Sequence, residues 1–88
     1  MGLEFTELAM SLEEDFGLSI STERMEKVRT IGDAEDLVMA LLCESAKPAN
    51  EAEVVDRVRV RIVELTSRTL DPKSLTREMR LVEDLGWG

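Results

Sequence analysis

The stretch that most constrains the fold runs from Leu3 to Ile20, LEFTELAMSLEEDFGLSI. Its apolar residues recur at steps of 3, 4 and 4 and so share one face of a helix: Phe5, Leu8, Leu12 and Phe16. Five acidic residues and no basic ones lie off that face: Glu4, Glu7, Glu13, Glu14 and Asp15. Gly17 can adopt the left-handed conformation that ends a helix. The pattern predicts a helix over 3–16 with one apolar and one anionic side.

The excess negative charge of the chain is confined to its first half. Residues 1–46 contain eleven Asp and Glu against three Lys and Arg, whereas residues 47–88 contain eight of each. Such a surface repels nucleic acid and anionic membranes, so we expect neither as a partner and regard a basic protein surface as the natural complement. An acidic face that only aids solubility is the alternative.

Composition predicts one small domain over 1–88, because the 88 residues are 43% apolar and 34% charged. The chain has no histidine, the usual proton shuttle and commonest metal ligand, so we expect no metal site and neither metal-assisted nor histidine-based catalysis. Cys43 adjoins Leu41 and Leu42 and is expected to be buried. No apolar run reaches membrane-spanning length and no signal peptide is visible, so a cytoplasmic protein is expected.

Capping signals predict three further helices. Ser21 or Thr22 begins a short one that continues to about Val28, and Asp33 caps the next, which continues to about Glu44. Asn50, followed by Glu53, opens the longest helix, from Glu51 to Ser67 or Arg68. The expected inward contacts of these three helices are Met25, Val28, Leu37, Val38, Leu41, Leu42, Val55, Val58, Ile62 and Leu65.

The last twenty residues carry only a weak helical signal. Asp71 and Pro72 predict a turn or two, with Leu75 directed inward. Four apolar residues are expected to anchor the rest: Met79, Leu81, Val82 and Leu85. The main core set for the whole chain is Phe5, Leu8, Leu12, Phe16, Ile31, Leu37, Leu41, Val58, Ile62, Leu65 and Leu81.

Two segments resemble an acyl carrier protein in swapped order. Leu3–Val38 resembles the second half of that family, with an acidic helix, a short helix and a T-I-G-D entry into the last helix. Val54–Gly86 resembles the first half, with an amphipathic helix, a D-P-x-x-L turn and the sequence VEDLG. In the family, VEDLG runs into a D-S-L motif and the acidic helix.

The resemblance implies an all-α, four-helix bundle, three main helices and one short one, in circularly permuted order. Residues 1–44 then correspond to the second half of the family, 45–50 to a linker, and 51–88 to the first half. Permutation is tolerated where the original ends lie close together and the new cut falls in an exposed loop.

Family members carry acyl thioesters on 4′-phosphopantetheine for fatty-acid, lipid or polyketide biosynthesis, and the serine of D-S-L holds that arm. Here Gly88 and Gly2 occupy the join in place of Asp and Ser. Ser11, Ser19 and Ser74 have no acid directly before them. We therefore expect a permanently apo carrier scaffold with no cofactor on this chain.

The resemblance also implies a docking face for basic patches on synthases and acyl-transfer enzymes. Its residues are Glu4, Glu7, Met10, Glu13, Glu14, Glu23 and Glu26. A monomer is expected. The alternatives are a dimerisation module whose copies exchange halves across SAKPAN, and an acidic helical adaptor unrelated to acyl transfer. Trp87, beside the join, either covers a pocket mouth or frays.

Overall fold

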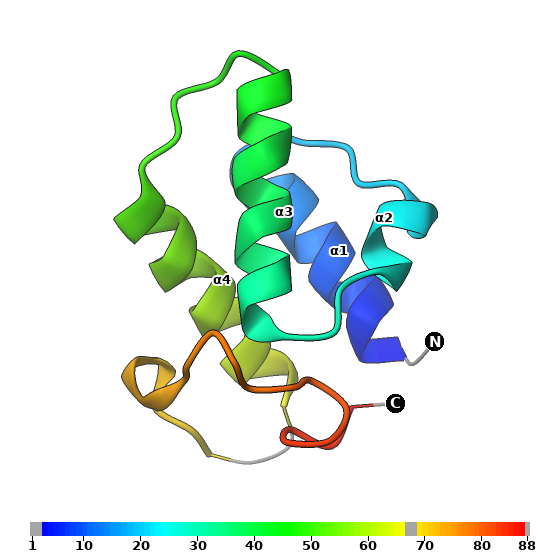
Figure 1. The fold of residues 1–88 in the computed structure, drawn as a ribbon, viewed down its shortest axis with the longest axis vertical. Coiled ribbons are helices and arrows are strands. Elements are labelled where there is room, and N and C mark those ends of the chain that lie inside the picture. The colour runs from blue at the N-terminus through cyan, green and yellow to red at the C-terminus, as the bar shows by residue number, and fades with distance from the viewer. Residues whose placement is uncertain (1–2, 67–68, 88) are drawn as a thin grey trace.

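Four α-helices and one 3₁₀ turn make up the computed structural model, which describes residues 3–66 and 69–87 (Figure 1). In chain order they are α1 (Leu3–Phe16), α2 (Thr22–Glu26), α3 (Ile31–Glu44), α4 (Glu51–Leu65) and the turn η1 (Pro72–Ser74). These ranges contain no strand, only an isolated bridge between Thr30 and Arg80. The predicted all-α fold, with three main helices and one short helix, is confirmed. Among the described residues, no helix has both the length and the apolar character to cross a membrane.

Helix α1 has the predicted bounds. Phe5, Leu8 and Leu12 are buried on its inner face, and Phe16 packs half-buried at its end. Gly17 follows with a φ of +64°, the left-handed conformation that terminates the helix. The 3.6-residue period and the glycine stop together determine this element.

The start of α3 differs from the prediction, because Thr30 and not Asp33 is the N-cap. Thr30 is extended (φ −119°, ψ 165°), and its Oγ1 accepts from the backbone N–H of Asp33 at 3.1 Å. The Asp33 carboxylate in turn accepts from the N–H of Thr30 at 3.2 Å, which completes a capping box. Helix α2 is capped by Ser21, one of the two predicted caps, but it ends at Glu26, two residues before Val28.

Helix α4 packs against α1, α3 and η1. Asn50 caps it as predicted, through a bond from the N–H of Glu53 to its Oδ1 at 3.1 Å. Its buried residues are Val54, Val58 and Ile62, whereas the predicted Val55 and Leu65 are half-buried. The helix ends at Leu65, before the predicted Ser67 or Arg68, because Thr66 is already extended at the C-cap.

The C-terminal segment crosses the start of α3 as a strap, which we define as residues 75–82. Three backbone bonds join them: Ile31 N to Met79 O at 3.0 Å, Gly32 N to Arg77 O at 3.0 Å, and Leu81 N to Arg29 O at 2.9 Å. Two carbonyl groups of the strap thus accept hydrogen bonds from N–H groups in the first turn of α3, which have no partner within the helix. Asp71 caps η1 and Leu75 is buried, both as predicted.

The core agrees with the predicted set, with specific exceptions. Eight of its eleven residues are buried, and Phe16, Leu37 and Leu65 pack half-buried against them. Leu81 and Leu85 anchor the C-terminal segment, but Val82 is 48% exposed. Cys43 is exposed, contrary to prediction, because the buried stripe of α3 passes through Val38, Leu41 and Leu42.

Trp87 neither frays nor lines the hollow described below, because it is 2% exposed inside the core. Its ring meets that of Phe5 edge-on, with centroids 5.3 Å apart and planes at 85°. The end of the described chain therefore lies beside the first turn of α1, as Figure 1 shows. The join itself, Gly88 and Gly2, lies outside the described residues.

Candidate functional site

The outward face of α1 combines carboxylates with exposed apolar side chains. Leu3, Glu7, Met10 and Glu14 recur at steps of 4, 3 and 4 and therefore form one stripe. Glu7 and Glu14 are exposed, as are Leu3 at 71% and Met10 at 58%. Large apolar groups flanked by acids are typical of a surface that binds a partner carrying both apolar and basic groups.

None of the six predicted docking carboxylates forms an ion pair within residues 3–66 and 69–87. Glu7, Glu14, Glu23 and Glu26 are exposed, and Glu4 is half-buried. Glu13 is different, because its carboxylate accepts from the backbone N–H of Ile20 at 2.8 Å. Glu13 therefore stabilises the segment that follows α1. The sequence, in which Glu13 is one of several neighbouring acids, did not predict this role.

Basic residues interrupt the acidic surface at α2. Arg24 pairs with Glu44 at 2.7 Å, and Lys27 is exposed directly after the helix. On the flank of α1 that faces α4, Arg61 donates two bonds of 2.7 Å to Asp15. These bonds hold the pKa of Asp15 below its ordinary value, against the effect of its partial burial. Among the described residues, the carboxylates of α1 that are both exposed and without an ion pair are therefore Glu7 and Glu14, on the Leu3–Glu14 stripe.

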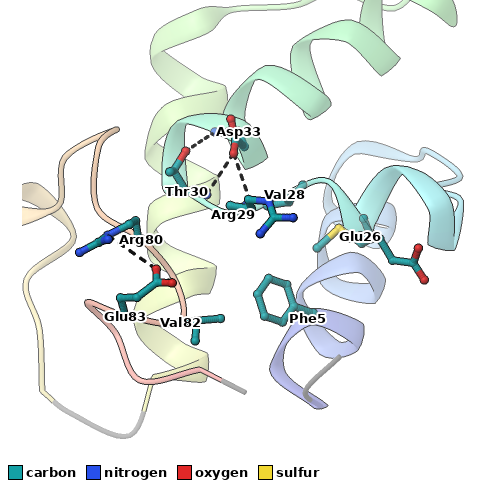
Figure 2. Close-up of a pocket in the computed structure, with 10 residues that line it drawn as sticks. Phe5, Glu26, Val28, Arg29, Thr30, Asp33, Arg80, Val82 and Glu83 are labelled. Atoms are coloured by element: carbon teal, nitrogen blue, oxygen red, sulfur yellow. Dashed lines mark hydrogen bonds and ion pairs between the residues drawn. The ribbon is translucent and has the colours of Figure 1, made fainter.

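A hollow of about 790 Å³ opens beside this surface (Figure 2). Its apolar lining comes from α1, α2, the link before α3, and the C-terminal segment: Phe5, Met25, Val28 and Val82. Its polar rim is formed by Glu26, Arg29, Thr30, Asp33, Arg80 and Glu83. Residues of both sequence halves therefore meet around one apolar floor.

Much of the polar rim is engaged in holding the loop that precedes α3. Asp33 accepts from the N–H groups of Arg29 and Thr30, as Figure 2 shows, and Arg80 lies 3.6 Å from Glu83. The N–H of Arg80 also donates to Asp84 at 2.7 Å, which lowers the pKa of that carboxyl. The hollow is thus suited to an apolar group, with polar contacts available only at its edge.

None of the alternative serines is placed at the start of α1. Ser11 lies half-buried in the middle of α1, and Ser19 is exposed in the link after it. Ser74 belongs to η1, where its hydroxyl donates to Asp71 O at 2.7 Å. The residue before Leu3 in the sequence is Gly2, which has no side-chain hydroxyl.

Two groups that hold the site together were not anticipated. Glu35, 1% exposed, binds Arg59 of α4 at 2.7 Å and Arg77 of the strap at 3.2 Å. Thr66 accepts from Trp87 Nε1 at 3.0 Å and donates to Ile62 O at 2.7 Å. Its spacing places Glu35 on the apolar stripe of α3, so its burial could be predicted from the sequence. Its partners, Arg59 and Arg77, are too distant in the sequence to be predicted in the same way.

Comparison with known proteins finds similarity to acyl carrier proteins over part of the chain. No family model matches the chain, and no solved structure does. Over 40 residues, which are 46% of the chain, it is 40% identical to acyl carrier protein 4 and to acyl carrier protein 1, both chloroplastic proteins of Cuphea lanceolata. These residues are 29% of each relative, so the chain spans less than a third of the length of the curated relatives it matches. The similarity therefore concerns less than half of this chain and less than a third of each relative.

Proposed function

We propose that this chain is an acyl-carrier-like scaffold in circularly permuted order. It docks through the acidic face of α1 and α2 on basic surfaces of acyl-transfer and synthase enzymes of fatty-acid, lipid or polyketide biosynthesis. It carries no phosphopantetheine of its own, and it is a binding partner and not a catalyst. Its two sequence segments, 1–44 and 51–88, are joined by the linker 45–50 and rebuild one bundle.

The contact between Phe5 and Trp87 is the observation that carries this proposal. A permuted carrier requires VEDLG to end where the acidic helix begins. Trp87 follows that sequence directly, and its ring lies 5.3 Å from that of Phe5 in the first turn of α1. Chain ends that meet in space are what a reordered sequence needs in order to retain the fold of its parent.

The extent of the similarity also supports a reordered chain. An alignment that keeps the order of residues can follow only one half of a permuted protein at a time. The match to the Cuphea carriers covers 46% of the chain, close to the share of one half. This chain is also a short all-α bundle whose first helix is acidic, as expected if its first segment corresponds to the second half of a carrier.

The unpaired carboxylates of α1 support docking on a basic partner. Glu7 and Glu14 are exposed and have no ion pair among the described residues, so an incoming Lys or Arg displaces only water. Met10 and Leu3, between and beside them, supply apolar area that an interface would bury. The electrostatic part of this attraction weakens as salt is added.

Docking is tested with the double variant Glu7→Lys and Glu14→Lys, measured against basic carrier-dependent enzymes by titration calorimetry. Binding should weaken at least tenfold, since two attractive charges become repulsive. The matched control is Asp56→Lys with Glu78→Lys, which changes the net charge equally at exposed residues away from this face. Equal weakening by both pairs would show a general charge effect and would remove the docking face from the proposal.

Absence of the arm is tested by incubating the protein with a phosphopantetheinyl transferase and coenzyme A. The intact mass should remain unchanged, because Gly2 precedes Leu3 where the family has serine. An ordinary acyl carrier protein in the same tube confirms that the transferase is active. A phosphopantetheine adduct on this chain would contradict the proposed apo scaffold.

A further inference from the structure

The segment 51–87 completes a core that residues 3–44 leave open. Helix α4 packs against both α1 and α3, and Val54, Val58 and Ile62 join the same cluster as the buried residues of those two helices. Without α4, the inner faces of α1 and α3 would lose their principal partner. The first segment therefore needs an α4, but nothing in the packing requires that α4 to belong to the same copy of the chain.

Specific polar contacts also connect the two segments. Arg59 of α4 binds Glu35 of α3 at 2.7 Å, and Arg61 of α4 binds Asp15 of α1 at 2.7 Å. The strap adds the three backbone bonds to Arg29, Ile31 and Gly32. Each of these contacts would be identical if the second segment came from another molecule.

The connection between the segments is exposed and locally strained. Every residue of 45–50 is exposed, and Figure 1 shows this linker outside the bundle, at the end of α3 opposite the strap. Ala46 has a φ of +54°, a conformation that its Cβ disfavours and that glycine adopts freely. Lys47 fastens the linker by a bond from Nζ to Gly17 O at 2.7 Å. Short hinge loops under strain favour exchange between copies.

We propose that two copies of this chain exchange their 51–87 segments through the linker 45–50 and form a reciprocal dimer. In this dimer α4 of each copy packs on α1 and α3 of the other, and the linker extends away from α3, which releases Ala46 from its left-handed conformation. In the dimer the hollow is lined by Phe5, Met25 and Val28 of one copy and by Val82 of the other. The inference depends only on the contacts between segments and is independent of the proposed carrier function.

Linker variants test the exchange by light scattering over a range of protein concentrations. The wild-type dimer fraction should rise with concentration. Ala46→Gly should weaken the dimer several-fold, because glycine relieves the strain in the closed monomer. Deletion of Ala46 and Lys47 should favour the dimer, because it shortens the linker and removes the Lys47 contact. A wild-type protein that stays monomeric at all concentrations, with a monomeric deletion variant, would overturn the proposal.

Mixing charge-reversed variants distinguishes exchanged segments from two intact bundles side by side. Asp15→Arg and Arg61→Asp each place like charges together in a closed chain. When the two variants are refolded together, exchange brings the arginine introduced at position 15 of one variant against the aspartate introduced at position 61 of the other. The other half of the same dimer then contains the native pair of Asp15 and Arg61. The mixture should therefore melt at a higher temperature than either variant alone.

The matched control is Arg24→Glu mixed with Glu44→Arg. This pair, at 2.7 Å, lies entirely within the first segment, so exchange cannot repair it and the mixture should show no rise. A rise in neither mixture, in a protein that is dimeric by light scattering, would show intact bundles in contact and would refute the exchange.

Discussion

The carboxylate of Glu35 on α3 lies 2.7 Å from Nε of Arg59 on α4, in the interior of the bundle. Arg59 also donates from Nη1 to Leu75 O at 2.9 Å, so one guanidinium joins α3, α4 and the start of the strap. Arg77 reaches the other oxygen of Glu35 at 3.2 Å. Burying this carboxylate is tolerable only because both of its oxygens have cationic partners.

Arg59→Met should lower the free energy of unfolding by about 3 kcal/mol, because it leaves a buried carboxylate without its nearest partner. Urea denaturation followed by circular dichroism measures this loss. Glu35→Met combined with Arg59→Met should cost less than the sum of the single changes, since no charge then remains unpaired. Arg24→Met, which breaks an exposed pair of the same length, is the control and should have a much smaller effect. Similar losses for Arg24 and Arg59 would contradict the importance assigned to burial.

Gly32→Ala should loosen the strap without unfolding the bundle. A Cβ at this position would lie 3.1 Å from both the carbonyl oxygen and the Cβ of Arg77, so the strap must move. Hydrogen exchange should accelerate several-fold at the amides of Ile31 and Leu81, which bond across this contact, and should be unchanged at Val58 in α4.

The control for this variant is Ala40→Gly, at an exposed position of the same helix. It changes helix propensity by about 1 kcal/mol but places no atom near the strap. Exchange at Leu81 should therefore respond to the change at Gly32 and not to the change at Ala40. Slow exchange at Leu81 in Gly32→Ala would mean that the strap accommodates the methyl group.

Thr66→Val should destabilise the protein by about 1–3 kcal/mol, because the buried indole N–H of Trp87 loses its acceptor while the side-chain shape is kept. Trp87 is the sole tryptophan, so its fluorescence during denaturation reports on this site directly. Thr66→Ser, which retains the hydroxyl, should be close to wild type. Thr69→Val, at an exposed threonine, should change little. If serine failed to rescue, packing of the threonine methyl and not the hydrogen bond would be responsible.

Local sequence rules were sufficient for some elements and failed where distant segments compete. Helix α1 follows from its apolar period and Gly17, both of which act within a few residues. The cap of α3 was misplaced because Thr30 and Asp33 are both good capping residues. The choice depends on the strap, whose carbonyls accept from Ile31 and Gly32 and so favour a helix that already begins at residue 31.

Burial of single side chains on α3 was also decided by long-range contacts. Cys43 was expected inside because it adjoins leucines, but the stripe through Leu41 and Leu42 turns Cys43 outward. Glu35 lies on that stripe, and its burial requires arginines that are 24 and 42 residues away in sequence. On the candidate site, exposure of Glu7, Met10 and Glu14 follows from helix geometry, whereas the inward bond of Glu13 to Ile20 depends on how the next link folds.

The pair of Asp15 and Arg61 predicts a specific pH dependence of stability. Hydrogen bonds from Arg61 hold the pKa of Asp15 below its ordinary value of 3.8. A carboxyl whose pKa is lower in the folded state stabilises that state above the unfolded pKa, and the contribution is lost as pH falls through the folded pKa. Arg61→Gln should therefore destabilise the protein at neutral pH, and the difference from wild type should shrink as the pH falls below about 4.

Two measurements check this expectation. Urea denaturation across the pH series gives the difference in unfolding free energy, and NMR titration of the Asp15 carboxyl in Arg61→Gln should show its pKa raised toward the ordinary value. Lys73→Gln is the control, because it removes a positive charge at an exposed lysine that forms no ion pair among the described residues. Its effect should be small and nearly independent of pH over the same range. Since Arg61 also pairs with Glu64 at 3.2 Å, Glu64→Gln separates that exposed contact from the bond to Asp15. An Asp15 pKa that did not move in Arg61→Gln would show that burial and Arg57, and not Arg61, determine its ionisation.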